Sequence, residues 1–248
     1  HQVDLFEAGA EIGGQFNVAK QVPGKEEFHE TLRYFRRQIE LRGVQLHLNT
    51  RVDVAGLVEG RYDEVVLATG VTPRRPAIDG IDHPKAVGYL EVLRDERPLG
   101  AKVAIVGAGG IGFDVAEALT HTGVSPSVAP EKFYAEWGID PNYAAAGGVV
   151  EPHPEASPRE VHLLQRKASK VGDGLGKTTG WIHRTGLKAR GVRMNSSVAY
   201  RRIDDAGLHV SVDGQDHTLA VDQVVICAGQ DPLRDLLDGL KAKKGDGQ

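Results

Sequence analysis

The stretch Val103-Ala104-Ile105-Val106-Gly107-Ala108-Gly109-Gly110-Ile111-Gly112 decides the fold, because an apolar run turns through G-x-G-x-x-G into a helical pattern at residues 113–119. Gly107 permits a tight turn, and Gly112 lets the helix pack against the strand. Between them, Gly109 and Gly110 let the backbone approach a phosphate, and the helix N-terminus supplies aligned N–H donors. The pattern predicts a dinucleotide site, with a plain tight turn as the alternative.

The first residues predict a second nucleotide-binding strand. Residues 2–7 form an apolar run that ends in Glu7, as in a Rossmann strand whose carboxylate binds ribose hydroxyls. The chain begins with His1 and its only methionine is Met194, so we expect a piece of a longer protein. The first strand and glycine loop of this site would then precede His1. An ordinary strand with a solvated glutamate is the alternative.

Length, composition and charge limit the class of protein. The chain has 248 residues, of which 40% are hydrophobic and 31 are glycine, enough for two modest lobes with many tight turns. A net charge of −4 and a pI near 6.2 argue against a nucleic-acid-binding surface. No apolar run approaches the roughly 20 residues that span a bilayer. We therefore expect no membrane partner and a cytoplasmic location.

The single cysteine, Cys227, limits the redox chemistry of this chain. One cysteine forms neither an internal disulfide, nor a C-x-x-C pair, nor a cysteine-ligated iron–sulfur cluster. Because it ends an apolar run at residues 224–229, we expect it to be a small core residue. We expect no metal site within the chain.

Strand-like and helical patterns alternate, as an α/β sheet requires. Residues 24–42 carry apolar side chains at helical spacing. The predicted strands are residues 44–52, 62–70, 161–165, 191–194, 198–203, and 208–212 with 219–221 as a hairpin. The run 224–229 ends in C-A-G, and we expect it to pair with residues 66–70, which end in A-T-G. Residues 120–160 are too long for an ordinary loop and predict a surface excursion or part of a binding face.

Two cations mark the end of one predicted strand. Arg166 and Lys167 follow residues 161–165, where an NAD site usually carries an acidic residue on the ribose. Cations at this position favour the 2′-phosphate of NADPH. The alternative is a basic surface turn.

Several strings in the same order resemble the bacterial NADPH-dependent 2,4-dienoyl-CoA reductase family of flavoprotein reductases. They are I12-G-G-Q-F-N17, Q21-V-P-G-K-E-E-F28, G107-A-G-G-I-G-F-D114, and Q165-R-K-A-S-K170 with G174-L-G-K-T-T-G-W-I-H-R184. The resemblance implies an α/β fold of two Rossmann-like domains, the second inserted in the first. Residues 1–99 would be a partial FAD-binding domain, residues 100–223 an NADPH-binding domain, and residues 224–248 the return to the first.

The resemblance also implies a larger enzyme of fatty acid β-oxidation. Its N-terminal (β/α)₈ barrel would hold FMN and a 4Fe-4S cluster, outside this chain. Hydride would pass from NADPH to FAD, and electrons would then travel through the cluster to FMN, which reduces an unsaturated acyl-CoA. The missing barrel of the same polypeptide would be the main partner of this chain.

Site residues follow from the resemblance. Glu7 would bind the adenosine ribose of FAD, and Gln15, Lys25 and the Val52 backbone would line its adenine and pyrophosphate. The other expected FAD contacts are Gly14, Ala68, Thr69 and Gly70. Lys170 and Trp181 would contact the phosphorylated ADP head of acyl-CoA, for which a cation and a flat ring are suited. No catalytic residue is expected in this chain.

Other functions on the same fold remain open. In proteins similar to trimethylamine dehydrogenase, the corresponding domains form a nucleotide-binding scaffold, and fold alone does not separate the two. Other ene-reductases differ in the missing barrel. A disulfide-type flavoprotein reductase is excluded by the absence of a cysteine pair.

Overall fold

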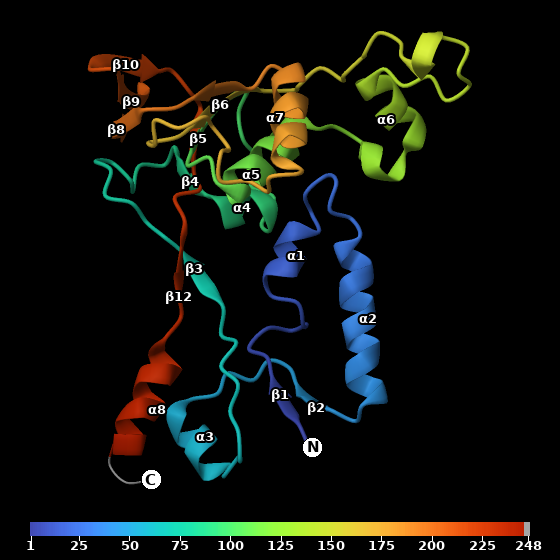
Figure 1. Ribbon diagram of the computed structural model, residues 1–248. Coiled ribbons are helices and arrows are strands. Elements are labelled where there is room, and N and C mark those ends of the chain that lie inside the picture. The colour runs from blue at the N-terminus through green and yellow to red at the C-terminus, as the bar shows by residue number, and fades with distance from the viewer. Residues whose placement is uncertain (246–248) are drawn as a thin grey trace. The chain divides into compact units, whose positions relative to one another are not determined.

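A computed structural model of the chain describes residues 1–245, which form two compact units (Figure 1). The central unit comprises Val18–Glu26 and Pro73–Gly229. The terminal unit comprises His1–Asn17, Glu27–Thr72 and the chain from Gln230 onward. No helix among the described residues is long and apolar enough to cross a membrane.

The central unit is built on a five-stranded sheet of order β4-β11-β5-β6-β7, in which every neighbouring pair is parallel. Its strands are β4 (Ala86–Gly88), β5 (Lys102–Val106), β6 (Glu160–Leu164), β7 (Arg193–Asn195) and β11 (Gln223–Ile226). An antiparallel sheet of β8 (Val198–Asp204), β9 (Gly207–Val212) and β10 (Gln215–Leu219) belongs to the same unit. The predicted α/β class with a parallel sheet is confirmed.

Two hydrophobic cores lie on opposite faces of the parallel sheet, because successive side chains of a strand alternate between faces. Val103 and Ile105 of β5 pack with the helices, whereas Ala104 and Val106 pack with the antiparallel sheet. The helices on the first face are α4 (Tyr89–Leu93), α5 (Gly110–Thr120) and α7 (Gly180–Ala189) (Figure 1). The near-continuous apolar run of β5 thus reflects burial on both sides.

Strand β11 pairs with other strands than the sequence predicts. Its residues pair with β4 on one side and with β5 on the other, in the register Ile226 to Val106. Both edges of β11 are therefore occupied, and residues 62–70 form no regular strand. Because β4 and β11 pair within the sheet of β5, the compact units divide at 72/73 and 229/230, and also at 17/18 and 26/27. The domains expected at residues 1–99, 100–223 and 224–248 stay a prediction.

The terminal unit contains less regular structure. Strand β1 (Asp4–Phe6) pairs in parallel with β2 (Gln45–His47), which is shorter than the predicted 44–52. The strand ends early because Asn49 has a positive φ of 52° and Asp53 then caps α3 (Val54–Glu59). The other elements that lie wholly or partly in this unit are α1 (Gln15–Ala19), α2 (Phe28–Leu41), β3 (Val71–Pro73), β12 (Gln230–Pro232) and α8 (Asp235–Gly245).

Residues 120–160 fold as part of the central unit. They contain the short helix η1 (Pro126–Val128), the helix α6 (Pro130–Trp137) and the short helix η2 (Ala146–Gly148). Gly138 ends α6 in the left-handed conformation, with a φ of 65°, and Ile139 forms an isolated bridge with Val149. This insertion carries its own aromatic side chains, Phe133 and Trp137, whose ring centroids are 6.2 Å apart.

Candidate nucleotide-binding sites

The glycine loop joins the end of β5 to the start of α5. Gly107 has a φ of 107°, and a Cβ there would collide with the Cys227 carbonyl. A Cβ on Gly112 would collide with the Gly107 carbonyl. The protein's own packing therefore requires glycine at both positions, one for the turn and one for the approach of helix to strand.

Packing within the protein does not require glycine at positions 109 and 110. A Cβ built on either one would meet nothing within 4 Å. Gly109 is also the N-cap of α5 and supplies no side-chain hydrogen bond to the first turn. A helix N-terminus carries unsatisfied N–H groups and a partial positive charge. The loop thus presents open space beside N–H donors, which fits a pyrophosphate.

The turn after β6 presents the two predicted cations. Gly107 N–H donates to the Leu164 carbonyl at 3.0 Å, which places this turn beside the glycine loop. The side-chain amide of Gln165 donates to the carbonyls of Lys167, at 3.1 Å, and Ser169, at 2.8 Å. Arg166 and Lys167 are exposed. The turn is therefore held by its own backbone and Gln165, and both cations face solvent next to the loop.

Tyr200 is a residue of this site that the sequence reasoning missed. It lies on β8, and its hydroxyl donates to the Leu164 carbonyl at 2.9 Å. Burial raises the pKa of Tyr200 to about 12, although the Gly107 N–H and Arg166 beside it offset part of the rise. Tyr200 thus stabilises the position of the end of β6 through this hydrogen bond. A single tyrosine among the alternating residues of a predicted strand was its only signal.

A cavity of about 750 Å³ lies in the terminal unit. It brings together four of the predicted FAD contacts, namely Glu7, Val52, Ala68 and Thr69. Glu7 Oε1 accepts a 2.6 Å hydrogen bond from the Gly9 N–H, so its carboxylate is already held in place. A carboxylate beside main-chain groups and apolar walls fits a nucleoside.

The other four predicted FAD contacts do not line this cavity, namely Gly14, Gln15, Lys25 and Gly70. Gly14 has a φ of 47°, and exposed Gln15 begins α1. Lys25 lies in the central unit, where its Nζ is 2.7 and 2.6 Å from the two carboxylate oxygens of Asp114 on α5. The family resemblance implies a diphosphate as the partner of Lys25, whereas the structure shows the carboxylate of Asp114.

Lys170 and Trp181 are both at the surface of the central unit. Lys170 accepts a backbone hydrogen bond from Asp173 in a turn, and its side chain is exposed. Trp181 lies on α7, is 53% exposed, and meets Trp137 edge to face at 6.3 Å between centroids. Their role in binding acyl-CoA stays a prediction.

With this geometry in hand, comparison with known proteins identifies the family. Residues 1–248 match the model of the pyridine nucleotide-disulphide oxidoreductase family. The chain belongs to this family. Cys227 is its only cysteine and is buried, so this member carries no redox-active cysteine pair within the chain.

Several similar proteins are reductases. Bilirubin reductase of Mediterraneibacter gnavus (strain CC55_001C) is 32% identical over 128 residues, 52% of this chain and 20% of that protein. Metal reductase of Desulforamulus reducens is 23% identical over 247 residues, 98% of this chain and 36% of that protein. The solved structure of 2-naphthoyl-CoA reductase with 2-naphthoyl-CoA has a TM-score of 0.75 and 25% identity, over 97% of this chain and 31% of that one.

These matches establish a coarse function. The chain is an NAD(P)-binding module of the flavoprotein oxidoreductase type, and the family supports binding of FAD as well. It spans 20–36% of the length of the relatives described above.

Proposed function

We propose that this chain is the electron-entry module of a larger NADPH-dependent reductase of the 2,4-dienoyl-CoA reductase type. The observation that carries the proposal is the open space at Gly109 and Gly110, before an uncapped helix and beside Arg166 and Lys167. When bound, NADPH supplies a hydride and FAD accepts it.

The residues of the chain bind and orient the donor. The N–H groups at the start of α5 hold the pyrophosphate, and Gly109 lets the backbone come close to it. Arg166 and Lys167 pair with the 2′-phosphate, which no carboxylate in the same turn repels. Tyr200 and Gln165 keep that turn in position.

The FAD half is proposed for the terminal unit. Glu7 binds the adenosine ribose there, with Val52, Ala68 and Thr69 along the same cavity. The acyl-CoA substrate, FMN and the 4Fe-4S cluster are proposed for the barrel of the parent protein. The strings shared with the 2,4-dienoyl-CoA reductase family support this substrate class, and the similarity to a reductase of an aromatic acyl-CoA is consistent with it.

The test is a titration of the chain with NADPH and with NADH, followed by Trp fluorescence. We expect NADPH to bind about 10- to 100-fold tighter, because hydrogen bonds to charged groups contribute about 1.5–3 kcal/mol. The double variant Arg166→Ala/Lys167→Ala should lose this preference. The matched control Arg94→Ala/Lys188→Ala removes two exposed cations of the same unit and should keep it. A folded chain that binds neither nucleotide would instead support the scaffold function.

A further inference from the structure

A second cavity, of about 580 Å³, lies in the central unit away from the glycine loop. Its walls come from α5, the insertion with α6, α7 and residues 22–25. None of Gly107, Gly109, Gly110 and Gly112 lines it. The nucleotide-binding function described above leaves this cavity without a role.

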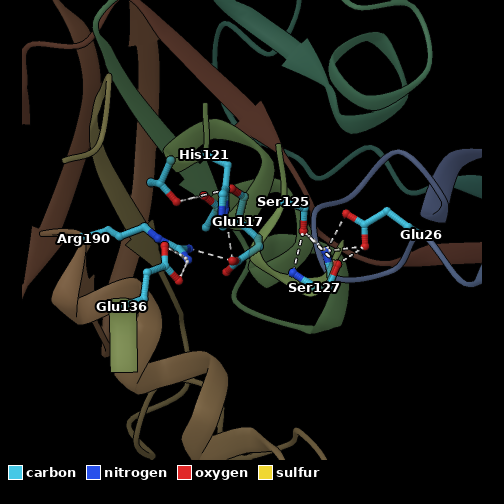
Figure 2. A network of polar contacts seen from close by, with 10 residues as sticks. Glu26, Glu117, His121, Ser125, Ser127, Glu136 and Arg190 are labelled. Atoms are coloured by element: carbon cyan, nitrogen blue, oxygen red, sulfur yellow. Dashed lines mark hydrogen bonds and ion pairs between the residues drawn. The ribbon is translucent and has the colours of Figure 1, made fainter. Parts of the chain in front are cut away.

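A buried charged cluster lines this cavity, and Figure 2 shows its side chains Glu117, His121, Glu136 and Arg190. Arg190 Nη1 is 2.6 Å from Glu117 Oε1, and Arg190 Nη2 is 3.3 Å from Glu136 Oε2. The Arg190 and Glu136 side chains are only 7% and 8% exposed. One guanidinium thus faces two carboxylates, which leaves an excess of one negative charge where charge is poorly solvated.

The carboxylate of Glu117 is ionised at neutral pH. Burial by itself would raise the pKa of Glu117, but the His121 ring and the Arg190 guanidinium beside it outweigh burial and lower this pKa below its usual range. The negative charge in the cluster is therefore present under physiological conditions.

His121 is the most informative side chain of the cavity. Its side chain is 6% exposed, and neither ring nitrogen has a hydrogen-bond partner among the described residues. Nδ1 lies 3.3 Å from Glu117 Oε1, which is an ion-pair distance, so Nε2 is the ring nitrogen that has no partner. A buried polar group without a partner is destabilising, because it has lost its hydrogen bonds to water and gained none in return. A ligand group in the cavity would remove this cost.

Apolar side chains form the outer part of the cavity. Phe133, which is 42% exposed, Trp137 and Ile182 line it, together with two prolines. Arg190 and Glu136 are therefore more deeply buried than Phe133 and Ile182, which are nearer solvent. Such a cavity is complementary to a molecule with a polar head and an apolar body.

The net charge of the cluster indicates which polar head group a ligand of this cavity would carry. An excess of carboxylates, a buried imidazole whose Nε2 has no partner, and nearby aromatic rings together favour an organic cation, which ring faces also attract. A metal ion does not fit, because the described residues include no group of three or more His, Cys, Asp or Glu side chains placed to hold one.

We propose that this cavity binds a small protonated amine whose ammonium group lies against Glu117, Glu136 and His121 and whose aromatic or branched apolar body packs on Phe133 and Trp137. The ammonium N–H groups hydrogen-bond to the carboxylates and to Nε2 of His121. Neither NADPH nor FAD takes part in this binding.

The test compares three probes of one shape, phenethylamine, phenethyl alcohol and 3-phenylpropionate, by calorimetry and by the fluorescence of Trp137 in a Trp181→Phe background. We expect the amine to bind at least about tenfold tighter than the alcohol, and the carboxylate to bind weakest. Glu136→Gln removes the excess charge and should bring amine and alcohol within about twofold of each other. The control Glu131→Gln, at an exposed position of the same helix, should leave the preference intact.

Equal affinity for amine and alcohol in the unaltered chain would overturn the proposal, as would the absence of measurable binding by all three probes. If Glu136→Gln fails to fold by circular dichroism, Phe133→Ala replaces it, because that side chain is partly exposed. We expect Phe133→Ala to weaken amine and alcohol equally, so that the preference for the amine persists. An unchanged affinity of Phe133→Ala for both probes would exclude the cavity as the binding site.

Discussion

Two glycines of the same loop should respond to the same substitution in opposite ways. Gly109 has φ −83° and ψ −172°, a conformation that alanine adopts without strain, and its Cβ would meet nothing within 4 Å. A Cβ on Gly112 would lie well under 3.0 Å from the Gly107 carbonyl oxygen, a backbone atom that has no room to retreat. Alanine at position 109 should therefore weaken only the binding of the ligand, whereas alanine at position 112 should destabilise the fold.

The magnitudes follow from these surroundings. Gly109→Ala should raise the free energy of unfolding by about 0.4–1 kcal/mol, because alanine restricts the unfolded chain more than glycine does. Its methyl group would occupy the space proposed for the pyrophosphate, so NADPH should bind at least about 30-fold more weakly, or about 2 kcal/mol. Gly112→Ala should lower the free energy of unfolding by about 3 kcal/mol, the upper end for an overpacked site.

Urea denaturation followed by circular dichroism measures the first quantity, and NADPH titration measures the second. Gly186→Ala is the matched control, because it adds a methyl group to helix α7 with nothing within 4 Å. It should stabilise the chain by up to about 1 kcal/mol and leave NADPH affinity unchanged. Unchanged NADPH affinity in Gly109→Ala would refute the assignment of the loop, and full stability of Gly112→Ala would refute the packing argument.

Three further predictions test other parts of the central unit. Burial raises the pKa of the Cys227 thiol, so this thiol should react with iodoacetamide only after unfolding, as mass spectrometry would show; rapid labelling of the folded chain would contradict its position under the glycine loop. The pKa of Tyr200 is raised to about 12 from 10.0, so the unfolded state ionises first and about 3 kcal/mol of stability should be lost between pH 10 and 12, a loss absent from Tyr200→Phe in parallel urea titrations. The pKa of Glu117 is lowered, so its ion pair with Arg190 stabilises the fold above the unfolded pKa of about 4.3, and this stability is lost as the pH falls through the folded value. Glu117→Gln should cost about 3 kcal/mol at pH 7 and remove that part of the acid dependence; equal acid sensitivity of both chains would contradict the pairing.

The sequence predicts the central unit well because its signals are local. The apolar run of β5, the glycine pattern and the helix that follows lie within about twenty residues, so one short stretch of sequence contains the whole signal. The predicted helix at 113–119 and the strands around 161–165 and 208–212 are confirmed within a few residues. The interpretation of Arg166 and Lys167 also rests on a local position, the end of β6.

Long-range pairing is where sequence reasoning failed. The runs that end in A-T-G and C-A-G look alike, and nothing within either run says which strand it joins. Backbone hydrogen bonds to β4 and β5 occupy both edges of β11, and Val66 is 89% exposed. Side-chain partners across long separations were missed for the same reason. Lys25 forms an ion pair with Asp114, and Arg190 forms ion pairs with Glu117 and Glu136. These residues are too far apart in the sequence for a spacing rule to predict their contact.

The distribution of buried side chains shows which of the two proposed nucleotide sites, the NADPH loop or the FAD cavity, has more structural support. The central unit buries apolar side chains on both faces of its sheet, and the glycine loop rests on that core through Cys227 and Leu163. Among the described residues of the terminal unit, Leu57 is the one buried hydrophobic residue, with 8% of its surface exposed. Because the geometry of a site is fixed by the packing beneath it, the NADPH loop has its own structural support. A folded central unit that failed to bind NADPH would therefore count against the loop itself, whatever the state of the FAD cavity.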